Sequence, residues 1–287
     1  MLILFASDYF DIKKVDDDYA AEHEAVCRIP EFKPVHYNYD EFVDDKPLKL
    51  YPNNYYTGEC LYRGWMLTPQ QYTALYSKLR EKGIHLINTS AQYEVCHCFP
   101  NAYTYVETHT PRILYFPTGA SIDWGLVNST FSRFMIKDAV KSVKGHDFPS
   151  AFETPIIASE MDAHVENFRN LRGKLFTGGI LLKEYVNFKK YGNSTNEYRA
   201  FYLKNNLLSL SRNSNQPETC PTPPQGLIEK YAKLPSNYYT VDFGELNNGQ
   251  WIVIETGDGQ VSGLSPMQFA FKYYDDIRFA LNSKTRR

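Results

Sequence analysis

The sequence lacks any apolar run long enough to cross a membrane, and it carries almost no net charge, with a formal value of −2 over 287 residues. A transmembrane helix needs about 20 apolar residues, so none is expected. Residues 1–7 lack a basic start and are too short for the apolar part of a secretory signal. A near-neutral charge gives no bulk electrostatic reason to expect nucleic acid as a partner. We therefore expect a soluble cytoplasmic protein and leave its oligomeric state open.

Cysteine is scarce, with five residues scattered along the chain. An odd and scattered set is typical of a reducing compartment rather than of a disulfide framework. Cys96-His-Cys98 raises the alternative of a zinc site, but the sequence has no CxxC pair that would complete a tetrahedral set of ligands. In a strand, Cys96 and Cys98 would share one face and His97 would take the other. We interpret all three as half-buried strand residues.

The N-terminal third combines strand and helix signals. Residues 2–6 form a short continuous apolar run, which is typical of a buried strand. A second strand over residues 60–67 is followed by Thr68-Pro-Gln-Gln71, a capping box with proline at the first helical position. Gly83 ends this helix before a strand over residues 84–88. The order strand, helix, strand predicts a βαβ unit in a small open α/β domain.

Local patterns predict three further features. Arg63 lies at the carboxyl end of the second strand, where open α/β sheets bind ligands; a plain surface arginine is the alternative. Ser265-Pro-Met-Gln268 is expected to cap the last helix. A helix that opens at Ser159 carries an apolar stripe that predicts core packing, formed by Val165, Phe168, Leu171 and Leu175.

Two runs rich in β-branched and aromatic residues flank Asn248-Gly249, the strongest short-range signal for a hairpin. A two-residue turn there places Asp242 directly opposite Glu255, whereas a turn at Asn247-Asn248 would oppose Glu255 to Thr240. Facing carboxylates destabilise a sheet unless they face water or a cation neutralises them. Oxygen ligands of this kind suit Mg²⁺, which usually also holds substrate phosphates. A solvated polar face is the alternative.

A second hairpin is predicted with a two-residue turn at Asn205-Asn206, which places Arg199 opposite Arg212. Two adjacent guanidiniums are tolerable where an anion lies between them. Ahead of both hairpins, residues 134–140 read as an apolar strand with Lys137 at its centre, the pattern of a strand lysine aimed at nucleotide phosphates. Together the strand and the two hairpins predict a site for a nucleoside triphosphate and Mg²⁺.

Taken in order, these features resemble the ATP-grasp family, and within it the clade marked by two arginines and a lysine. The resemblance covers about residues 130–270 and rests on Lys137, Lys183-Glu-Tyr-Val186, Arg199, Arg212 and Asp242…Glu255-Thr-Gly-Asp258. It implies an ATP-grasp fold of mixed α+β and α/β class, with two α+β lobes that clamp ATP. The implied division is 1–90 for an N-terminal α/β domain, 91–185 for the first lobe and 186–287 for the second, catalytic lobe.

The resemblance also implies which residues would hold ATP. Lys137 would contact the nucleotide phosphates, while Glu184 and the backbone of Val186 would recognise adenine by binding it. The full set of implied nucleotide contacts is Lys137, Lys144, Lys183, Glu184 and Val186. The glycine-rich phosphate loop of the family is reduced here to residues 141–145.

Catalytic and metal-binding roles are implied in the same way. Arg199 and Arg212 would hold the γ-phosphate and the developing acyl phosphate. Asp242 and Glu255 would bind Mg²⁺. The usual Glu-x-Asn metal pair of the family is Glu-Thr-Gly in this chain, so either Asp258 supplies the missing oxygen ligand or one metal ion is lost.

The implied activity is an ATP- and Mg²⁺-dependent ligase that joins the carboxylate of an amino acid or peptide to an amine. The carboxylate would be activated as an acyl phosphate, with release of ADP and phosphate. The alternative is an ATP-binding regulatory or partner-binding protein that keeps the fold without ligation. Nucleotidyl transfer ranks last, because Lys137-Asp-Ala-Val lacks the glycine of a Lys-x-Asp/Asn-Gly nucleophile motif.

Overall fold

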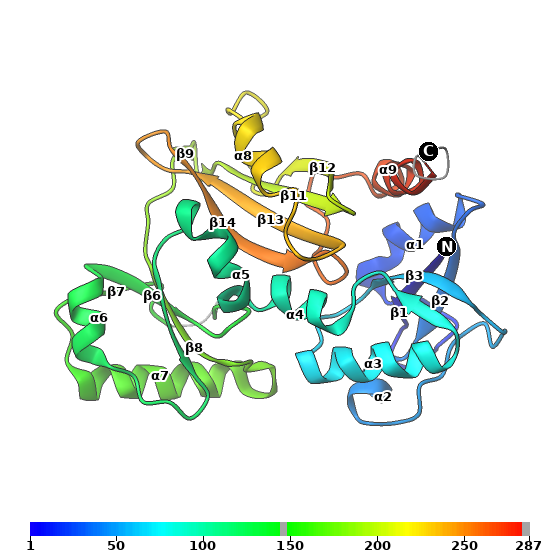
Figure 1. Ribbon diagram of the computed structural model, residues 1–287, viewed down its shortest axis with the longest axis horizontal. Coiled ribbons are helices and arrows are strands. Elements are labelled where there is room, and N and C mark those ends of the chain that lie inside the picture. The colour runs from blue at the N-terminus through cyan, green and yellow to red at the C-terminus, as the bar shows by residue number, and fades with distance from the viewer. Residues whose placement is uncertain (144–147, 283–287) are drawn as a thin grey trace.

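The computed structural model describes residues 1–143 and 148–282, and its N-terminal part is built on a parallel sheet (Figure 1). The strand order is β2-β1-β3-β4, and each neighbouring pair is parallel. The strands are β1 (Leu2–Ala6), β2 (Lys33–Tyr37), β3 (Gly58–Arg63) and β4 (Ile84–Leu86). The helices of this part are α1 (Ala20–Cys27), α2 (Tyr39–Val43) and α3 (Pro69–Glu81), with a 3-10 turn at Asp17–Tyr19.

The expected βαβ unit is present, since α3 connects the parallel strands β3 and β4. Thr68 caps α3 as predicted: its hydroxyl accepts from the Gln71 amide, and the Gln71 side chain accepts from the Thr68 amide at 2.9 Å. Tyr72, Leu75 and Leu79 lie on the buried face of α3 and pack against the sheet. The capping box and the apolar spacing therefore fix both the start of the helix and the face that it buries.

Two helices at the centre of the molecule, α4 (Ser90–His97) and α5 (Phe99–Val106), join the N-terminal sheet to the rest of the chain (Figure 1). The strand expected around Cys96-His-Cys98 is wrong. Thr89 and Gln92 form a second capping box, so the chain enters a helix that ends at His97, and all three side chains are buried. Among the described residues, no group of three or more His, Cys, Asp or Glu side chains is arranged to hold a metal ion.

The second sheet has the order β5-β8-β6-β7 and is antiparallel. Its elements are β5 (Ile113–Pro117), α6 (Trp124–Thr130), β6 (Arg133–Lys137), β7 (Phe152–Glu153), α7 (Ala158–Arg172) and β8 (Gly179–Glu184), with 3-10 turns at Glu107–His109 and Gly173–Leu175. Val165 and Phe168 of α7 pack against this sheet, but Leu171 and Leu175 are 39% and 55% exposed. Leu175 falls outside the stripe because α7 ends at Arg172, whereas Leu171 lies in the last turn of the helix.

The third sheet is also antiparallel, with the order β12-β11-β13-β14. Its strands are β11 (Glu197–Leu203), β12 (Asn206–Arg212), β13 (Tyr238–Glu245) and β14 (Trp251–Asp258). Beside it lie β9 (Lys190–Tyr191), β10 (Ser194–Thr195) and α8 (Gln225–Lys230). The second and third sheets lie on opposite sides of a space that Lys137 and Glu255 span by an ion pair.

The last helix, α9 (Ala270–Asn282), returns to the N-terminal sheet and packs beside α1 (Figure 1). Tyr273, Tyr274 and Ile277 share a core cluster with Ile3 and Phe5. The capping box expected at 265–268 is half formed: the Gln268 side chain accepts from the Ser265 amide at 3.3 Å, but the Ser265 hydroxyl donates to Asn213. The expected helix start is wrong, since α9 begins at Ala270. None of the helices within the described ranges is both long and apolar enough to span a membrane. The division at residues 90 and 185 stays a prediction.

Arg63 is neither a ligand-facing nor a surface side chain, so both expectations for it are wrong. It is fully buried, and its guanidinium donates to both carboxylate oxygens of Glu22 at 2.8 Å. Its remaining nitrogen donates to the carbonyls of Gly259 and Ser262, in the loop after β14. Glu22 also accepts from the Tyr274 hydroxyl at 2.7 Å. This network joins α1, β3, the 259–262 loop and α9 across the interface between the first and third sheets.

We predict that Glu22→Gln lowers the free energy of unfolding by about 3–5 kcal/mol, because it leaves the buried Arg63 charge without a counterion. Urea titration followed by circular dichroism measures the change. Asp17→Asn is the matched control, since the Lys14–Asp17 pair is solvent-exposed and its loss is expected to change the stability far less. Equal effects of the two variants would contradict a structural role for the Arg63–Glu22 pair.

Candidate functional site

A cavity of about 520 Å³ lies between the second and third sheets. Its lining combines cationic, anionic and apolar side chains from strands β6, β8, β11, β13 and β14. Seven of the ten predicted site residues line it: Lys137, Lys183, Glu184, Val186, Arg199, Asp242 and Glu255. Lys144 lies outside the described residues, and the structure places Arg212 and Asp258 elsewhere, as described below.

The β13–β14 hairpin opposes Asp242 to Glu255, which confirms the predicted pairing. The turn that produces it differs from both predicted turns. Leu246 and Gln250 close a three-residue loop in which Gly249 takes a φ of +83°, and a bulge next to Asp242 shifts the register back by one residue. The longer loop and the bulge shift the register by one residue in opposite directions. Asp242 therefore pairs with Glu255 although the predicted two-residue turn is wrong.

The β11–β12 hairpin does not oppose the two arginines, so that prediction is wrong. Lys204 and Asn205 form the turn with φ values of 47° and 68°, and a bulge follows at Phe201. Arg199 therefore faces Ser211, while Arg212 faces Tyr198. Because successive residues of a strand point to opposite faces, Arg212 points away from the face that carries Arg199.

Arg212 is held by groups of its own loop. Its guanidinium donates to the Gln216 carbonyl at 2.9 Å and to the Glu218 carboxylate at 2.8 Å. Arg212 is not one of the described residues that line the cavity. The site is therefore built on Arg199 alone of the two arginines.

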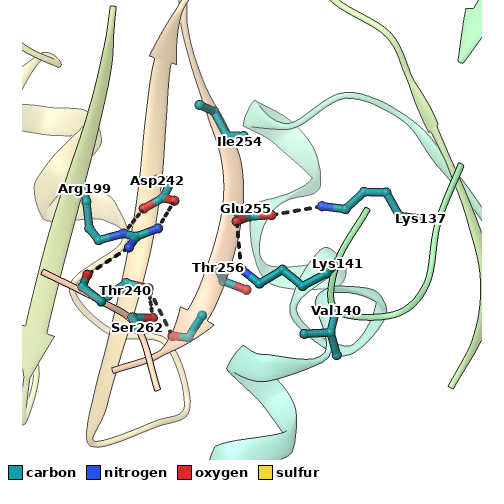
Figure 2. Close-up of polar contacts among 12 residues, drawn as sticks. Lys137, Val140, Lys141, Arg199, Thr240, Asp242, Ile254, Glu255, Thr256 and Ser262 are labelled. Carbon is teal, nitrogen blue, oxygen red and sulfur yellow. Dashed lines mark hydrogen bonds and ion pairs between the residues drawn. The ribbon is translucent and has the colours of Figure 1, made fainter. Parts of the chain in front are cut away.

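Each carboxylate of the facing pair has its own cation (Figure 2). Arg199 donates to both oxygens of Asp242, at 2.8 and 2.7 Å. Lys137 donates to Glu255 at 2.9 Å, and Lys141 lies 3.6 Å from its other oxygen. Burial works to raise the pKa of Glu255, but the charges of Lys137 and Lys141 outweigh it and hold that pKa well below its usual range. Both carboxylates are thus paired with neighbouring cations.

Lys183 is a buried basic side chain of the site, as Lys137 is. Its ammonium donates to the Ile254 carbonyl and lies 4.1 Å from the centre of the Phe99 ring. Burial, reinforced by the charge of Lys137, holds the pKa of Lys183 well below its usual range. A basic side chain of this kind gains a full charge readily when an anion such as phosphate lies beside it.

At the far end of β8, Glu184 forms a two-point ion pair with Arg112 at 2.7 and 3.1 Å. This hydrogen bonding is the main reason why the pKa of Glu184 is lowered. No local signal in the sequence pointed to Arg112, which lies 72 residues earlier in the chain. Lys141 did have such a signal, since it precedes Lys144 by three positions in the sequence.

Asp258 does not join the metal ligands, so the expected three-carboxylate cluster is wrong. It lies opposite Tyr239 and is fully buried. Its oxygens accept from the Asn88 side chain and, at 2.9 Å, from the Gln260 amide. It follows Glu255 by an odd number of residues, which places the two side chains on opposite faces of β14.

The donors that remain fit Mg²⁺. Asp242 and Glu255 are hard oxygen ligands on one face of the hairpin, and they line a cavity large enough for a nucleotide's phosphate groups. Mg²⁺ is usually held by one or two carboxylates together with substrate phosphates and water. Lys137, Lys141 and Arg199 supply the positive charge that phosphate oxygens require.

Comparisons with known proteins agree with this geometry. The model of an ATP-grasp domain, family 3 of the clade marked by two arginines and a lysine, matches residues 122–277. D-alanine–D-alanine ligase from Bacillus anthracis, complexed with ATP, has a TM-score of 0.61 at 12% identity, over 99% of this chain and 98% of its own. D-cycloserine synthetase DcsG has a TM-score of 0.61 at 11% identity, over 98% and 100%.

A third similar structure is the ATP-grasp ligase PsnB, complexed with a phosphomimetic variant of its minimal precursor, Mg and ADP. It has a TM-score of 0.56 at 11% identity, over 96% of each chain. A search of curated proteins gave no significant match. The family match and these structures confirm the ATP-grasp fold expected from the sequence.

We predict that Asp258→Asn changes how stability depends on pH. Burial raises the pKa of Asp258 to about 7, although hydrogen bonds from Asn88 and Gln260 oppose the rise. The folded protein therefore keeps a proton that the unfolded chain releases near pH 4. The contribution of Asp258 is fully present below that pH and is lost as the pH rises to about 7.

The measurement is the free energy of unfolding of both proteins in urea at several values between about pH 4 and pH 8. Relative to Asp258→Asn, the wild type should lose stability across this window and level off above it. A difference that stays constant with pH, or that grows in favour of the wild type, would show that the carboxylate is ionised in the fold.

Proposed function

Because the chain belongs to the ATP-grasp domain family, in family 3 of the clade marked by two arginines and a lysine, we propose that it is an ATP- and Mg²⁺-dependent ligase that joins a carboxylate to an amine. One observation carries the proposal. The facing pair Asp242 and Glu255 meets Lys137, Lys141 and Arg199 in a single cavity. Paired carboxylates and convergent cations suit the transfer of a phosphoryl group better than any other use of such a cavity.

In the proposed site, Lys137 and Lys183 face the nucleotide phosphates, with Lys144 as a further candidate. Glu184 and the backbone of Val186 lie at the adenine end, where Arg112 orients the glutamate. Arg199, which Asp242 holds in place through two of its guanidinium nitrogens, would set a fixed positive charge beside the transferring phosphoryl group. These assignments extend the family resemblance with the contacts of this chain.

Asp242 and Glu255 would hold Mg²⁺, which neutralises phosphate charge when it is bound. In the proposed reaction, a carboxylate oxygen of the first substrate bonds to the γ-phosphorus and ADP leaves. The amine nitrogen then bonds to the acyl carbon, phosphate leaves and the nitrogen loses a proton. The protein's task is to hold the reacting groups in line and to place positive charge where negative charge develops.

The substrates are proposed as small molecules or peptides that carry a carboxylate and an amine. The similar structures support this class in outline, since one is a D-alanine–D-alanine ligase and another is a ligase complexed with a variant of its minimal precursor. At 11–12% identity they do not select among amino acids or peptides for this chain.

A second candidate function is an ATP-binding regulatory or partner-binding protein without ligation. One observation favours it: residue 257 is glycine where the family pattern has asparagine, so the oxygen ligands of the metal are fewer. The two candidates differ in whether nucleotide is consumed.

We predict that the purified protein, given ATP, Mg²⁺ and its carboxylate and amine substrates, forms ADP in step with the ligated product. Hydroxylamine should intercept the activated acid as a hydroxamate, which a colorimetric iron assay detects. Nucleotide binding without ADP formation over a broad panel of amino acids and peptides would favour the regulatory candidate. Release of AMP and pyrophosphate would contradict the acyl-phosphate route.

We predict that Lys137→Ala and Arg199→Ala each lower kcat/KM for ATP by roughly 10- to 150-fold, as expected when a charged hydrogen bond of about 1.5–3 kcal/mol is lost. Arg169→Ala is the matched control, because this arginine pairs with Glu166 on the surface of α7. Arg212→Ala tests the sequence-based assignment directly. A loss as large as that of Arg199→Ala would restore Arg212 to the phosphate site.

A further inference from the structure

We propose that the site takes a single divalent cation and that the guanidinium of Arg199 occupies the place of a second one. The inference rests on the proposed use of Mg²⁺ and nucleotide, and it concerns how this chain compensates for the ligand that its sequence lacks. Three observations carry it: the packing at Gly257, the orientation of Asp258 and the pairing of Asp242.

A side chain at position 257 would collide with two hydroxyl groups that are bonded to each other. A Cβ atom added to Gly257 would lie 2.8 Å from both the Ser262 and the Thr240 hydroxyl oxygens. Those hydroxyls are 2.9 Å apart, and Ser262 also donates to the Asp258 carbonyl at 2.8 Å. Figure 2 shows Thr240 and Ser262 beside Arg199. An asparagine at this position would have to displace the two hydroxyls. The space that a ligand side chain would need is therefore filled by Thr240 and Ser262.

Asp258 cannot replace the missing ligand. It lies on the face of β14 opposite to Glu255 and is enclosed by Asn88 and Gln260, which occupy both of its oxygens. The buried network continues from Gln260 to the Tyr72 hydroxyl at 2.7 Å. Turning Asp258 toward the cavity would break these bonds and leave buried donors without partners.

The carboxylate of Asp242 already binds a cation, the guanidinium of Arg199. The Arg199 fork engages both oxygens of Asp242, and its third nitrogen donates to the Gly263 carbonyl at 3.0 Å. The Arg199 side chain is largely buried, and its charge is balanced by the carboxylate of Asp242. The fork uses about two of the four lone-pair sites of the carboxylate, which leaves enough for one metal ion between Asp242 and Glu255.

Asn213 is the other polar side chain beside Asp242. Its amide nitrogen lies 3.5 Å from Asp242, while its oxygen accepts from the Ser265 hydroxyl at 3.1 Å. Its oxygen is therefore already used within the fold. The fixed positive charge next to Asp242 is that of Arg199, at the point where a second metal ion would otherwise bind this carboxylate.

Manganese stoichiometry tests the proposal without reference to activity. The wild type is titrated with Mn²⁺ in the presence of a saturating non-hydrolysable ATP analogue, and free Mn²⁺ is followed by electron paramagnetic resonance. We expect one bound Mn²⁺ per nucleotide complex. Arg199→Met should raise the number toward two, because it frees both oxygens of Asp242, whereas Arg199→Lys and the surface control Arg169→Met should keep it at one.

Two bound ions in the wild type would overturn the proposal, whether or not the Arg199 variants fold. If Asn213→Ala then reduced the number from two to one, Asn213 would be the missing ligand. One ion in both the wild type and a folded Arg199→Met protein would overturn the role of Arg199. Failure of the wild type to bind any nucleotide-dependent Mn²⁺ would contradict the proposed function itself, which distinguishes that failure from the others.

Discussion

The structure depends on two carboxylates that face each other across one hairpin. Asp242 and Glu255 would repel each other in an isolated hairpin, and their sheet position is stable because cations from three other segments neutralise them. Arg199 comes from the neighbouring strand, whereas Lys137 comes from the second sheet. The ion pairs of Glu255 with Lys137 and Lys141 line the cavity and also connect the second sheet to the third. The same charges therefore form the site and help to hold the two sheets together.

The N-terminal sheet is attached to the same hairpin through the loop that follows β14. Arg63 binds the carbonyls of Gly259 and Ser262, while Arg199 binds the carbonyl of Gly263. Two arginines from different sheets thus fix one loop of a few residues. This loop therefore links the N-terminal sheet to Arg199 through hydrogen bonds to its backbone carbonyls.

Local signals in the sequence predicted the parts of the structure that local interactions determine. The capping box at Thr68 set the start of α3, and the alternation around Asn248-Gly249 produced the hairpin. Register was less secure, because it depends on single-residue bulges that a short window does not encode. The β13–β14 bulge restored the expected pair, whereas the turn at Lys204 and Asn205 separated Arg199 from Arg212. Partners distant in sequence, such as Glu22 for Arg63, could not be predicted from either residue alone.

The two halves of the carboxylate pair differ in how firmly their cations are fixed. Arg199 is held by three hydrogen bonds from a planar fork, so its charge is preorganised. Lys137 and Lys141 reach Glu255 through single contacts from flexible stems, and Lys141 is partly exposed. Under the proposed function, phosphate oxygens would take over the lysines from Glu255, and a metal ion would replace the lysines on that carboxylate. The Arg199–Asp242 contacts would persist during this exchange, so the site would combine one fixed cation with two exchangeable ones.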